Sequence, residues 1–213
     1  MASARCPEDA IVPLIDVYPI DAIPTEPWRN GGGTTRTIAT GGADWRVSLA
    51  SIERDGPYSR FPGMSRVSLI LGGQGVVLRN DAAVVPLRPM RVTAYDGDAD
   101  WGATLVDGPS VALNAMTAKH RYRANVRLVD EPIAIAPGCP AIVVALGGGC
   151  DFAEGPDANR RALPPGSVLV SEHHARTLRL FPRAACAGPT GTASYAALVT
   201  IEPVPATNIT ETS

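Results

Sequence analysis

The chain has 213 residues, of which 45% are hydrophobic, and its 19 basic and 21 acidic side chains leave a formal net charge of −2. This length allows one large or two small domains with a sizeable core, and the small net charge gives no general attraction for nucleic acid or an anionic membrane. The sequence lacks both a secretory signal pattern and a run approaching the roughly 18 apolar residues of a membrane span. We therefore expect a soluble, cytoplasmic protein.

Short alternating or continuous apolar runs, separated by Gly and Pro, extend along the chain without a sustained helical period. They predict an all-β protein, with strands at residues 14–19, 34–39, 45–52, 66–71, 76–79, 91–95, 103–106, 111–116 and 122–130. A second series of strands is predicted at 141–146, 167–171, 177–180 and 195–202. The 20 prolines and 21 glycines suit the tight connections that such a fold needs.

The two series of strands resemble each other. In each, an apolar strand leads into a glycine-rich turn, at 72–75 and at 147–149, and a proline-containing segment then precedes another strand. A long apolar strand closes each series. This repeat predicts a duplicated jelly-roll barrel, with units at 1–125 and 126–213 packed together, although two unrelated hairpin pairs would give a similar pattern.

Segment 27–36, Pro-Trp-Arg-Asn-Gly-Gly-Gly-Thr-Thr-Arg, is the most distinctive stretch of the chain. Glycines let backbone N–H groups approach a bound anion, and Arg29 and Arg36 suit bidentate bonds to a carboxylate. The segment therefore indicates an acid-binding loop. A glycine hairpin with Trp28 in the core and solvated arginines fits the same residues.

The histidines and cysteines do not have the spacing of a metal site. His120 follows a predicted strand, His173 and His174 are adjacent, and no HxH or HxxxH pattern occurs. No CxxC pair occurs either, so we expect reduced thiols at Cys6, Cys139, Cys150 and Cys186. The sequence predicts no metal and no other cofactor.

Four segments together resemble a known family. They are 27–36, 44–50 (Asp-Trp-Arg-Val-Ser-Leu-Ala), 56–63 (Gly-Pro-Tyr-Ser-Arg-Phe-Pro-Gly) and 113–117 (Leu-Asn-Ala-Met-Thr). In order and spacing, the chain resembles the HutD/Ves family over most of its length. The resemblance implies a bicupin, two cupin-like antiparallel jelly-roll barrels without the metal-binding histidines of catalytic cupins. It also implies an accessory or regulatory role in bacterial histidine utilisation, through an intermediate such as formylglutamate or urocanate.

The family motifs transfer nine expected ligand-binding residues onto this chain, which are Trp28, Arg29, Asn30, Thr34, Arg36, Arg60, Phe61, Asn114 and Met116. Arg36 and Arg60 are the expected carboxylate grips. Asn30 and Asn114 would orient the ligand, and the apolar members of the set would form a wall that excludes water.

Several of these residues have a structural alternative. Trp28 and Phe61 also suit a hydrophobic core. Arg60 is suited to bonding turn carbonyls, and Asn114 to satisfying a buried backbone group.

Predicted strand 45–52 presents Trp45, Val47 and Leu49 on one face, which we assign to the core. Arg46 and Ser48 then lie on the opposite face. If that face lines a barrel lumen, Arg46 joins the binding candidates.

The leading hypothesis is a non-enzymatic protein that senses or sequesters a small carboxylic acid. The alternative is a metal-independent cupin isomerase or hydrolase, for which Glu53, Asp55 and Tyr58 are candidate proton-transfer groups, although no nucleophile stands beside a base. A protein-binding module is a third class. The expected partner is a small carboxylic-acid metabolite, with neither nucleic acid nor membrane, and a homodimer is compatible with the sequence.

Overall fold

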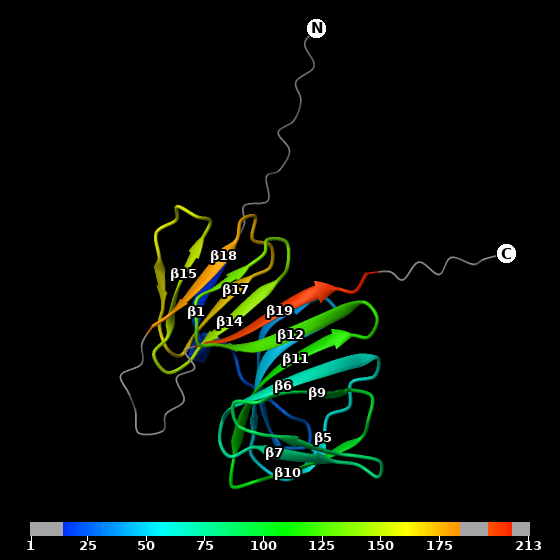
Figure 1. Cartoon of the computed structure of the whole chain (residues 1–213). Coiled ribbons are helices and arrows are strands. Elements are labelled where there is room, and N and C mark those ends of the chain that lie inside the picture. The colour runs from blue at the N-terminus through cyan, green and yellow to red at the C-terminus, as the bar shows by residue number, and fades with distance from the viewer. Residues whose placement is uncertain (1–14, 184–195, 206–213) are drawn as a thin grey trace, which may run out of the picture.

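The computed structural model describes residues 15–183 and 196–205. Its regular structure consists of β-strands, which Figure 1 shows, and one short 3-10 helix, η1 (Ile20–Ala22). Every pairing between named strands is antiparallel. The all-β prediction is thus confirmed. Within the described ranges, no helix is long and apolar enough to cross a membrane.

The first unit contains β2 (Glu26–Pro27), β3 (Gly33–Gly41), β4 (Trp45–Ile52), β5 (Gly56–Tyr58), β6 (Met64–Gly72), β7 (Val76–Arg79), β8 (Val84–Leu87), β9 (Val92–Asp96), β10 (Trp101–Leu105) and β11 (Ser110–Ala118). These strands form two sheets. A six-stranded sheet has the order β2-β3-β4-β11-β6-β9, and a four-stranded sheet has the order β5-β10-β7-β8.

The second unit contains β12 (Tyr122–Val129), β13 (Ile133–Ile135), β14 (Ala141–Ala145), β15 (Cys150–Glu154), β16 (Arg161–Leu163), β17 (Ser167–Ser171), β18 (Leu178–Pro182), β19 (Ala196–Pro203) and also β1 (Ile15–Pro19). Its sheets have the orders β1-β17-β14-β19-β12 and β13-β18-β15-β16. Strand β1 precedes the first unit in sequence but pairs with β17 of the second. The boundary expected between residues 125 and 126 falls inside β12.

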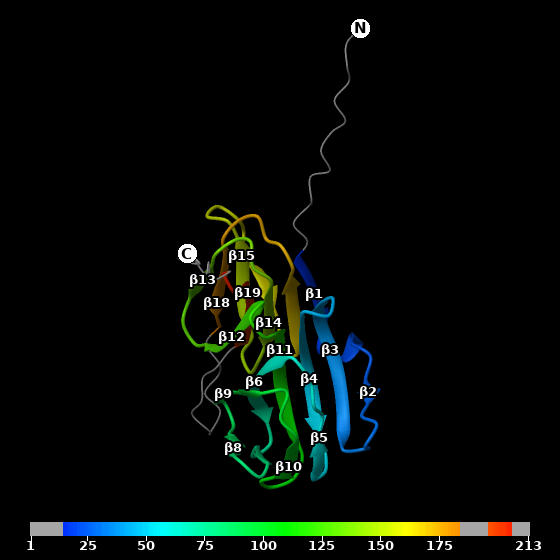
Figure 2. The same ribbon diagram turned by 90° about the vertical axis from the view of Figure 1, so that its right-hand side faces the viewer.

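The two units repeat one strand order. The order β4-β11-β6-β9 of the first unit corresponds to β12-β19-β14-β17 of the second, and β5-β10-β7-β8 corresponds to β13-β18-β15-β16. Each label rises by eight, so successive strands trace the same path twice. Figure 2 shows the first unit below and the second above.

A glycine turn occurs at the same place in both units. Gly75 has a φ of 110° and Gly149 has a φ of 71°, which is backbone that a residue with a side chain rarely adopts. A Cβ on Gly75 would lie 2.4 Å from the Leu87 carbonyl oxygen, and one on Gly149 would lie 2.6 Å from that of Leu163. The two glycine-rich turns of the sequence therefore occupy corresponding positions in the structure.

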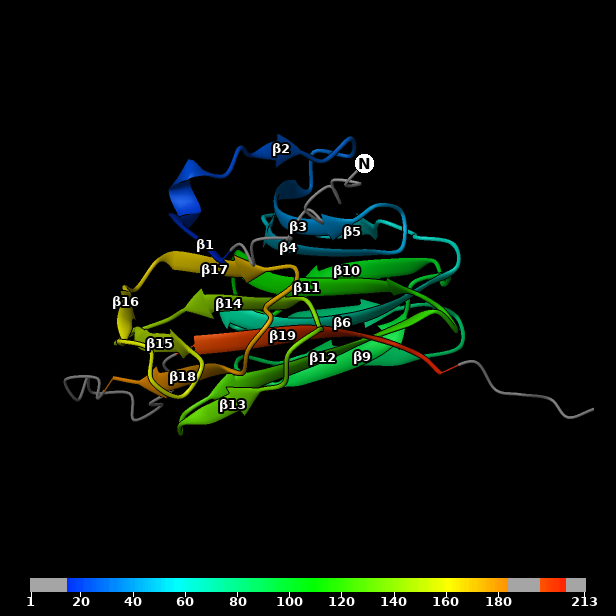
Figure 3. The same ribbon diagram turned by 90° about the horizontal axis from the view of Figure 1, so that it is seen from above.

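Three apolar clusters fill the part of the molecule that the structure describes. One cluster, which contains Val47 and Val199, draws residues from both large sheets and lies between them. A second, around Leu78, lies between the two sheets of the first unit, and a third, around Phe152, lies between those of the second. The large sheets thus pack against each other and the smaller ones cover the outside. In Figure 3, strands of both large sheets run in nearly the same direction.

The apolar pattern does not predict the short strands β2, β5, β8, β13, β15 and β16. Each has two to five residues, and all except β13 include a proline, a glycine or a charged residue. Such strands form through pairing with longer neighbours.

Of the four cysteines that we expect to be reduced, Cys139 and Cys150 are free thiols in the structure. Cys6, Cys186 and the predicted strand ends at residues 14 and 195 lie outside the described residues.

Candidate ligand-binding site

Alternation along β4 directs polar side chains into the first unit. Trp45, Val47 and Leu49 belong to the core between the large sheets, as the sequence predicts. Successive strand residues point to opposite faces, so Arg46 and Ser48 point between the two sheets of the first unit. This face lines the lumen of the first unit. The sequence alone did not decide whether Arg46 faces a lumen.

The strand register sets two arginines on either side of one methionine. On β11, Met116 lies opposite Arg46 of β4 and opposite Arg66 of β6. In the next row, Asn114 lies between the serines of the same two strands. Three neighbouring strands thus form a polar floor inside the first unit.

Arg66 is buried, with only 4% of its surface exposed. Its Cζ lies 4.6 Å from the ring centroid of Tyr58 and 5.1 Å from those of Phe61 and Tyr95. Its Nη1 donates to the Ser59 carbonyl at 3.1 Å, but its Nε has no hydrogen-bond partner. None of the four ion pairs within the described residues includes Arg66. Its charge therefore lies against aromatic faces, without a carboxylate.

Arg46 shares one of these rings. Its Cζ lies 5.1 Å from the Phe61 centroid, and its Nη2 is 4.0 Å from the Met116 Sδ. Burial, and then the nearby Arg66 charge, lower the pKa of Arg46, whereas Glu26 acts in the opposite direction. The Arg46 Nε is also buried without a partner. Two neighbouring guanidiniums thus each keep one unused donor.

A chain of hydroxyl groups leads from the edge of the site to Asn114. The Ser68 hydroxyl donates to the Asn114 Oδ1 at 2.5 Å. Because Ser68 has only one proton to donate, its 2.8 Å contact with the Tyr95 hydroxyl has Tyr95 as the donor. Burial is the main cause that raises the pKa of Tyr95. This chain fixes the orientation of the Asn114 amide.

Two adjoining hollows open over this floor, an inner chamber of about 30 Å³ and an outer chamber of about 490 Å³. Residues that line both are Trp28, Thr35, Arg46, Tyr58, Ser59 and Phe61. The inner chamber adds Ser48, Ala50, Arg66, Asn114 and Met116. The outer chamber adds Glu26, Pro27, Arg29, Asn30, Pro57, Arg60 and Asp100. The Tyr58 hydroxyl is buried without a partner, so it is a third unused polar group here.

The structure brings seven of the nine expected residues to these chambers. The inner chamber is lined by Trp28, Phe61, Asn114 and Met116, and the outer chamber by Trp28 and Phe61 together with Arg29, Asn30 and Arg60. The amide of Asn30 also holds its own loop, because it donates to the Pro57 carbonyl at 2.7 Å and accepts from the Gly32 N–H at 2.9 Å.

Arg36 and Thr34 do not line either chamber. Arg36 lies opposite Leu49 in the sheet, so its side chain starts from the face turned away from the lumen. Its guanidinium donates to the carbonyl of Ile23. Thr34 is paired between Pro27 and Ser51. The arginines that line the lumen are instead Arg46 and Arg66.

Sequence reasoning missed Arg66 and Tyr95, and named Tyr58 only as a proton-transfer candidate. Arg66 begins a predicted apolar strand, where a charged residue is conspicuous. Its partner tyrosines come from β5 and β9, and their approach depends on strand pairing. A charge on the same strand face as Ser68 was the available signal.

The lumen does not suit a divalent metal ion. Its floor offers two guanidiniums, which repel a cation, where imidazole or carboxylate ligands would be needed. Across the described ranges, no group of three or more His, Cys, Asp or Glu side chains is placed to hold a metal.

A family model described as HutD matches residues 21–187. The chain belongs to the HutD family. It is 32% identical over 178 residues to Protein Ves of Citrobacter koseri, covering 74% of this chain and 93% of that protein. It is also 35% identical over 114 residues to an uncharacterized 21.2 kDa protein in the hutC 3′ region of Pseudomonas putida, covering 50% of this chain and 60% of that one.

Solved structures show the same fold. A conserved protein of unknown function from Pseudomonas aeruginosa has a TM-score of 0.72 at 26% identity, covering 89% of this chain and 98% of that one. The structure of HutD from Pseudomonas fluorescens, in a formate condition, also scores 0.72, at 24% identity, with coverage of 89% and 99%. An oxalate decarboxylase from Lactobacillus farciminis scores 0.57 at 6% identity, with coverage of 87% and 85%. The fold is cupin-like.

Proposed function

We propose that this HutD-family protein binds a small carboxylic acid in the first unit and thereby modulates histidine utilisation. One observation carries the proposal: Arg46 and Arg66 are held side by side with unused donors and with no ion-pair partner in the described chain. Enclosed charges are costly unless they are paired. An anionic ligand would compensate both charges.

A carboxylate is the anion that this arrangement favours. Guanidinium groups bind planar carboxylates through paired, charge-assisted hydrogen bonds. The Tyr58 hydroxyl supplies a further polar group, and Trp28 and Phe61 give the apolar wall that excludes water. The small inner chamber suits the carboxylate, and the outer chamber suits the rest of the acid.

The histidine-utilisation role draws its support from relatives. The match in the hutC region of Pseudomonas putida and the structural likeness to HutD support such a role. Formylglutamate and urocanate are therefore the acids to test first. The repeated strand order further supports our proposal that the two units are cupin-like barrels and the chain a bicupin.

Calorimetric titration of the purified protein with formylglutamate, urocanate, histidine and glutamate tests this function. We expect saturable binding of one acid, weakened at least about 30-fold in Arg66→Met and in Arg46→Met, because each removes a charged partner from an enclosed site. Arg36→Met is the matched control, since Arg36 lies on the opposite face of the sheet. It should bind like the wild type.

Two other results would contradict the proposal. Binding that survives loss of both lumen arginines, or that depends on Arg36, would reject the lumen site. Conversion of a bound acid, followed by NMR, would favour a metal-independent isomerase or hydrolase instead.

A further inference from the structure

Residues 59–64, here called the mouth loop, run from the end of β5 to the first residue of β6 and carry Arg60 and Phe61 over the site. Backbone hydrogen bonds tie this loop to the segment after β9. The Phe61 N–H donates to the Gly97 carbonyl at 2.8 Å, and the Gly97 N–H donates to the Met64 carbonyl at 3.0 Å. The mouth loop thus depends on the segment after β9 for its position.

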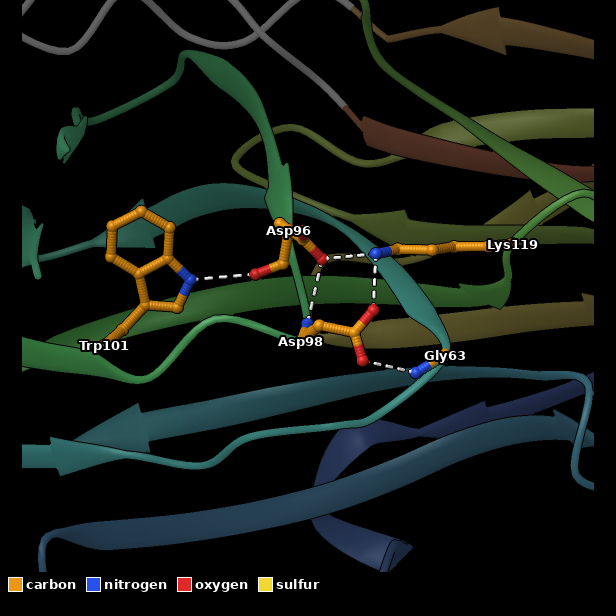
Figure 4. Close-up of polar contacts among 5 residues, drawn as sticks. All are labelled: Gly63, Asp96, Asp98, Trp101 and Lys119. Carbon is orange, nitrogen blue, oxygen red and sulfur yellow. Dashed lines mark hydrogen bonds and ion pairs between the residues drawn. The ribbon is translucent and has the colours of Figure 1, made fainter. Parts of the chain in front are cut away.

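Lys119 joins these two segments, as Figure 4 shows. Its ammonium donates to Asp96 at 2.6 Å and to Asp98 at 2.5 Å. The other Asp98 oxygen accepts from the Gly63 N–H of the mouth loop at 2.6 Å. The Lys119 backbone N–H also donates to the Gly63 carbonyl, at 2.9 Å. Lys119 is the only lysine in the chain.

Lys119 also connects the mouth loop to the floor of the site. It follows directly after β11, the strand that carries Asn114 and Met116. Through Asp98, its side chain thus links the end of this floor strand to the loop that carries Phe61. Phe61 lines both chambers and stacks on both lumen arginines, so a shift of the mouth loop changes the whole site.

This cluster is too exposed to contribute much to global stability. The side chains of Lys119, Asp96 and Asp98 keep 29%, 52% and 35% of their surface exposed. Exposed ion pairs contribute little to folding. Their geometry still matters where it fixes one segment against another, because a binding constellation loosens when its supports move.

We propose that Lys119 is a positioning residue of the ligand site, which holds the mouth loop through Asp96 and Asp98 so that Phe61 covers the two lumen arginines. The proposal rests on the function proposed above. Lys119 itself does not line the inner or the outer chamber. Its effect on binding therefore passes through the mouth loop.

Lys119→Met tests the proposal, with Lys119→Arg as the conservative variant. We expect Lys119→Met to lower the hydrogen-exchange protection of the Phe61 and Gly63 amides and to weaken acid binding about tenfold. Its melting temperature should fall by less than about 3 °C. Lys119→Arg, which keeps a cation able to bridge two carboxylates, should restore most of both losses.

Arg183→Met is the matched control. Arg183 pairs with Asp151 at 2.5 Å in the second unit and is also a surface cation. Its loss should leave acid binding and mouth-loop protection unchanged. This control separates the effect of the Lys119 position from the loss of any surface ion pair.

Gly97→Ala gives an independent test that keeps every charge. A Cβ on Gly97 would lie 2.5 Å from the Met64 carbonyl oxygen, so it should push the mouth loop away. We expect weakened binding like that of Lys119→Met. If Lys119→Met fails to fold, this variant still tests whether the position of the mouth loop controls acid binding.

Unchanged amide protection, or unchanged affinity, in Lys119→Met would overturn the proposal. If the wild-type protein binds none of the acids, the proposed function fails instead. The exchange comparison between wild type and Lys119→Met then still shows whether Lys119 holds the mouth loop.

Discussion

The interiors of the two units differ although their strands follow the same path. In the first unit, the floor strands β4, β6 and β11 present two arginines, two serines and an asparagine to the lumen. In the second, the corresponding strands β12, β14 and β19 contribute Val129, Val143 and Leu198 to a closed apolar cluster. Its polar residues, such as Arg127 and Glu202, line a hollow of about 180 Å³ together with Ile135 and Leu198 of that cluster.

This difference fits our proposal, in which the duplicated fold divides stability and binding between its two copies. A packed apolar interior stabilises the folded state through burial and dispersion. An interior with unpaired guanidiniums gives up part of that stabilisation but retains groups for a ligand. We infer that the second unit mainly supports the fold, while the first unit carries the site.

Phe152→Ala in the second unit should have the largest effect on stability. Phe152 is 1% exposed within the apolar cluster, and its truncation should cost about 3–5 kcal/mol of the free energy of unfolding. Urea denaturation would measure this loss. Acid binding to the remaining folded protein should be unchanged, and an altered affinity would show that the two interiors are coupled.

Asn114→Leu would make the first lumen more like the second. It leaves the buried Ser68 hydroxyl without its acceptor, which should cost about 1–3 kcal/mol of stability despite the added apolar surface. Thermal and urea unfolding would measure it. The double variant Ser68→Ala with Asn114→Leu should recover part of the loss. If the double variant recovers nothing, the stability lost in Asn114→Leu comes from altered packing rather than from the unpaired Ser68 hydroxyl.

Gly75→Ala and Gly149→Ala test whether the two equivalent turns require glycine to the same degree. Both glycines have left-handed backbone and face a nearby carbonyl oxygen, so each substitution should cost at least about 1–2 kcal/mol. Gly108→Ala is the control, because Gly108 also has a positive φ of 75° but nothing within 4 Å of an added Cβ. Equal losses at all three sites would assign the cost to φ alone.

The Lys119 cluster should show the smallest effect, a response only at extreme pH. The hydrogen bond from Lys119 is the main cause that holds the pKa of Asp96 and of Asp98 below 3.8, with Arg60 also acting on Asp98, and it raises the pKa of Lys119 above 10.5. The carboxylate contribution is therefore complete above pH 3.8 and is lost as pH falls through the lowered pKa values. The ammonium contribution is complete below pH 10.5 and is lost as pH rises through the raised pKa.

Amide protection of Gly63, corrected for intrinsic exchange, should thus stay flat from about pH 5 to about pH 9. The Arg183–Asp151 pair of the second unit can be compared with the Lys119 cluster, because the hydrogen bond to Asp151 also raises the pKa of Arg183. A change in Gly63 protection within this range would contradict the view that the Lys119 cluster holds the mouth loop.

Local patterns in the sequence were enough to predict several features of this protein. Period-two apolar runs indicate strands because a half-buried strand alternates its faces, and the core face of β4 follows from that rule. The two glycine turns were also visible, since only glycine tolerates that backbone beside a carbonyl. The long motifs identified the HutD family, and seven of the nine transferred residues line the chambers.

Tertiary structure decided which arginines enter the lumen and which short strands complete the sheets. Arg36 looked like a carboxylate grip, yet its position opposite Leu49 directs it away from the lumen. Arg46 and Arg66 are neighbours only because β11 pairs with both β4 and β6. A shift of one residue in register reverses every side chain on a strand. Such long-range pairing, together with packing between sheets, is not encoded in any local pattern.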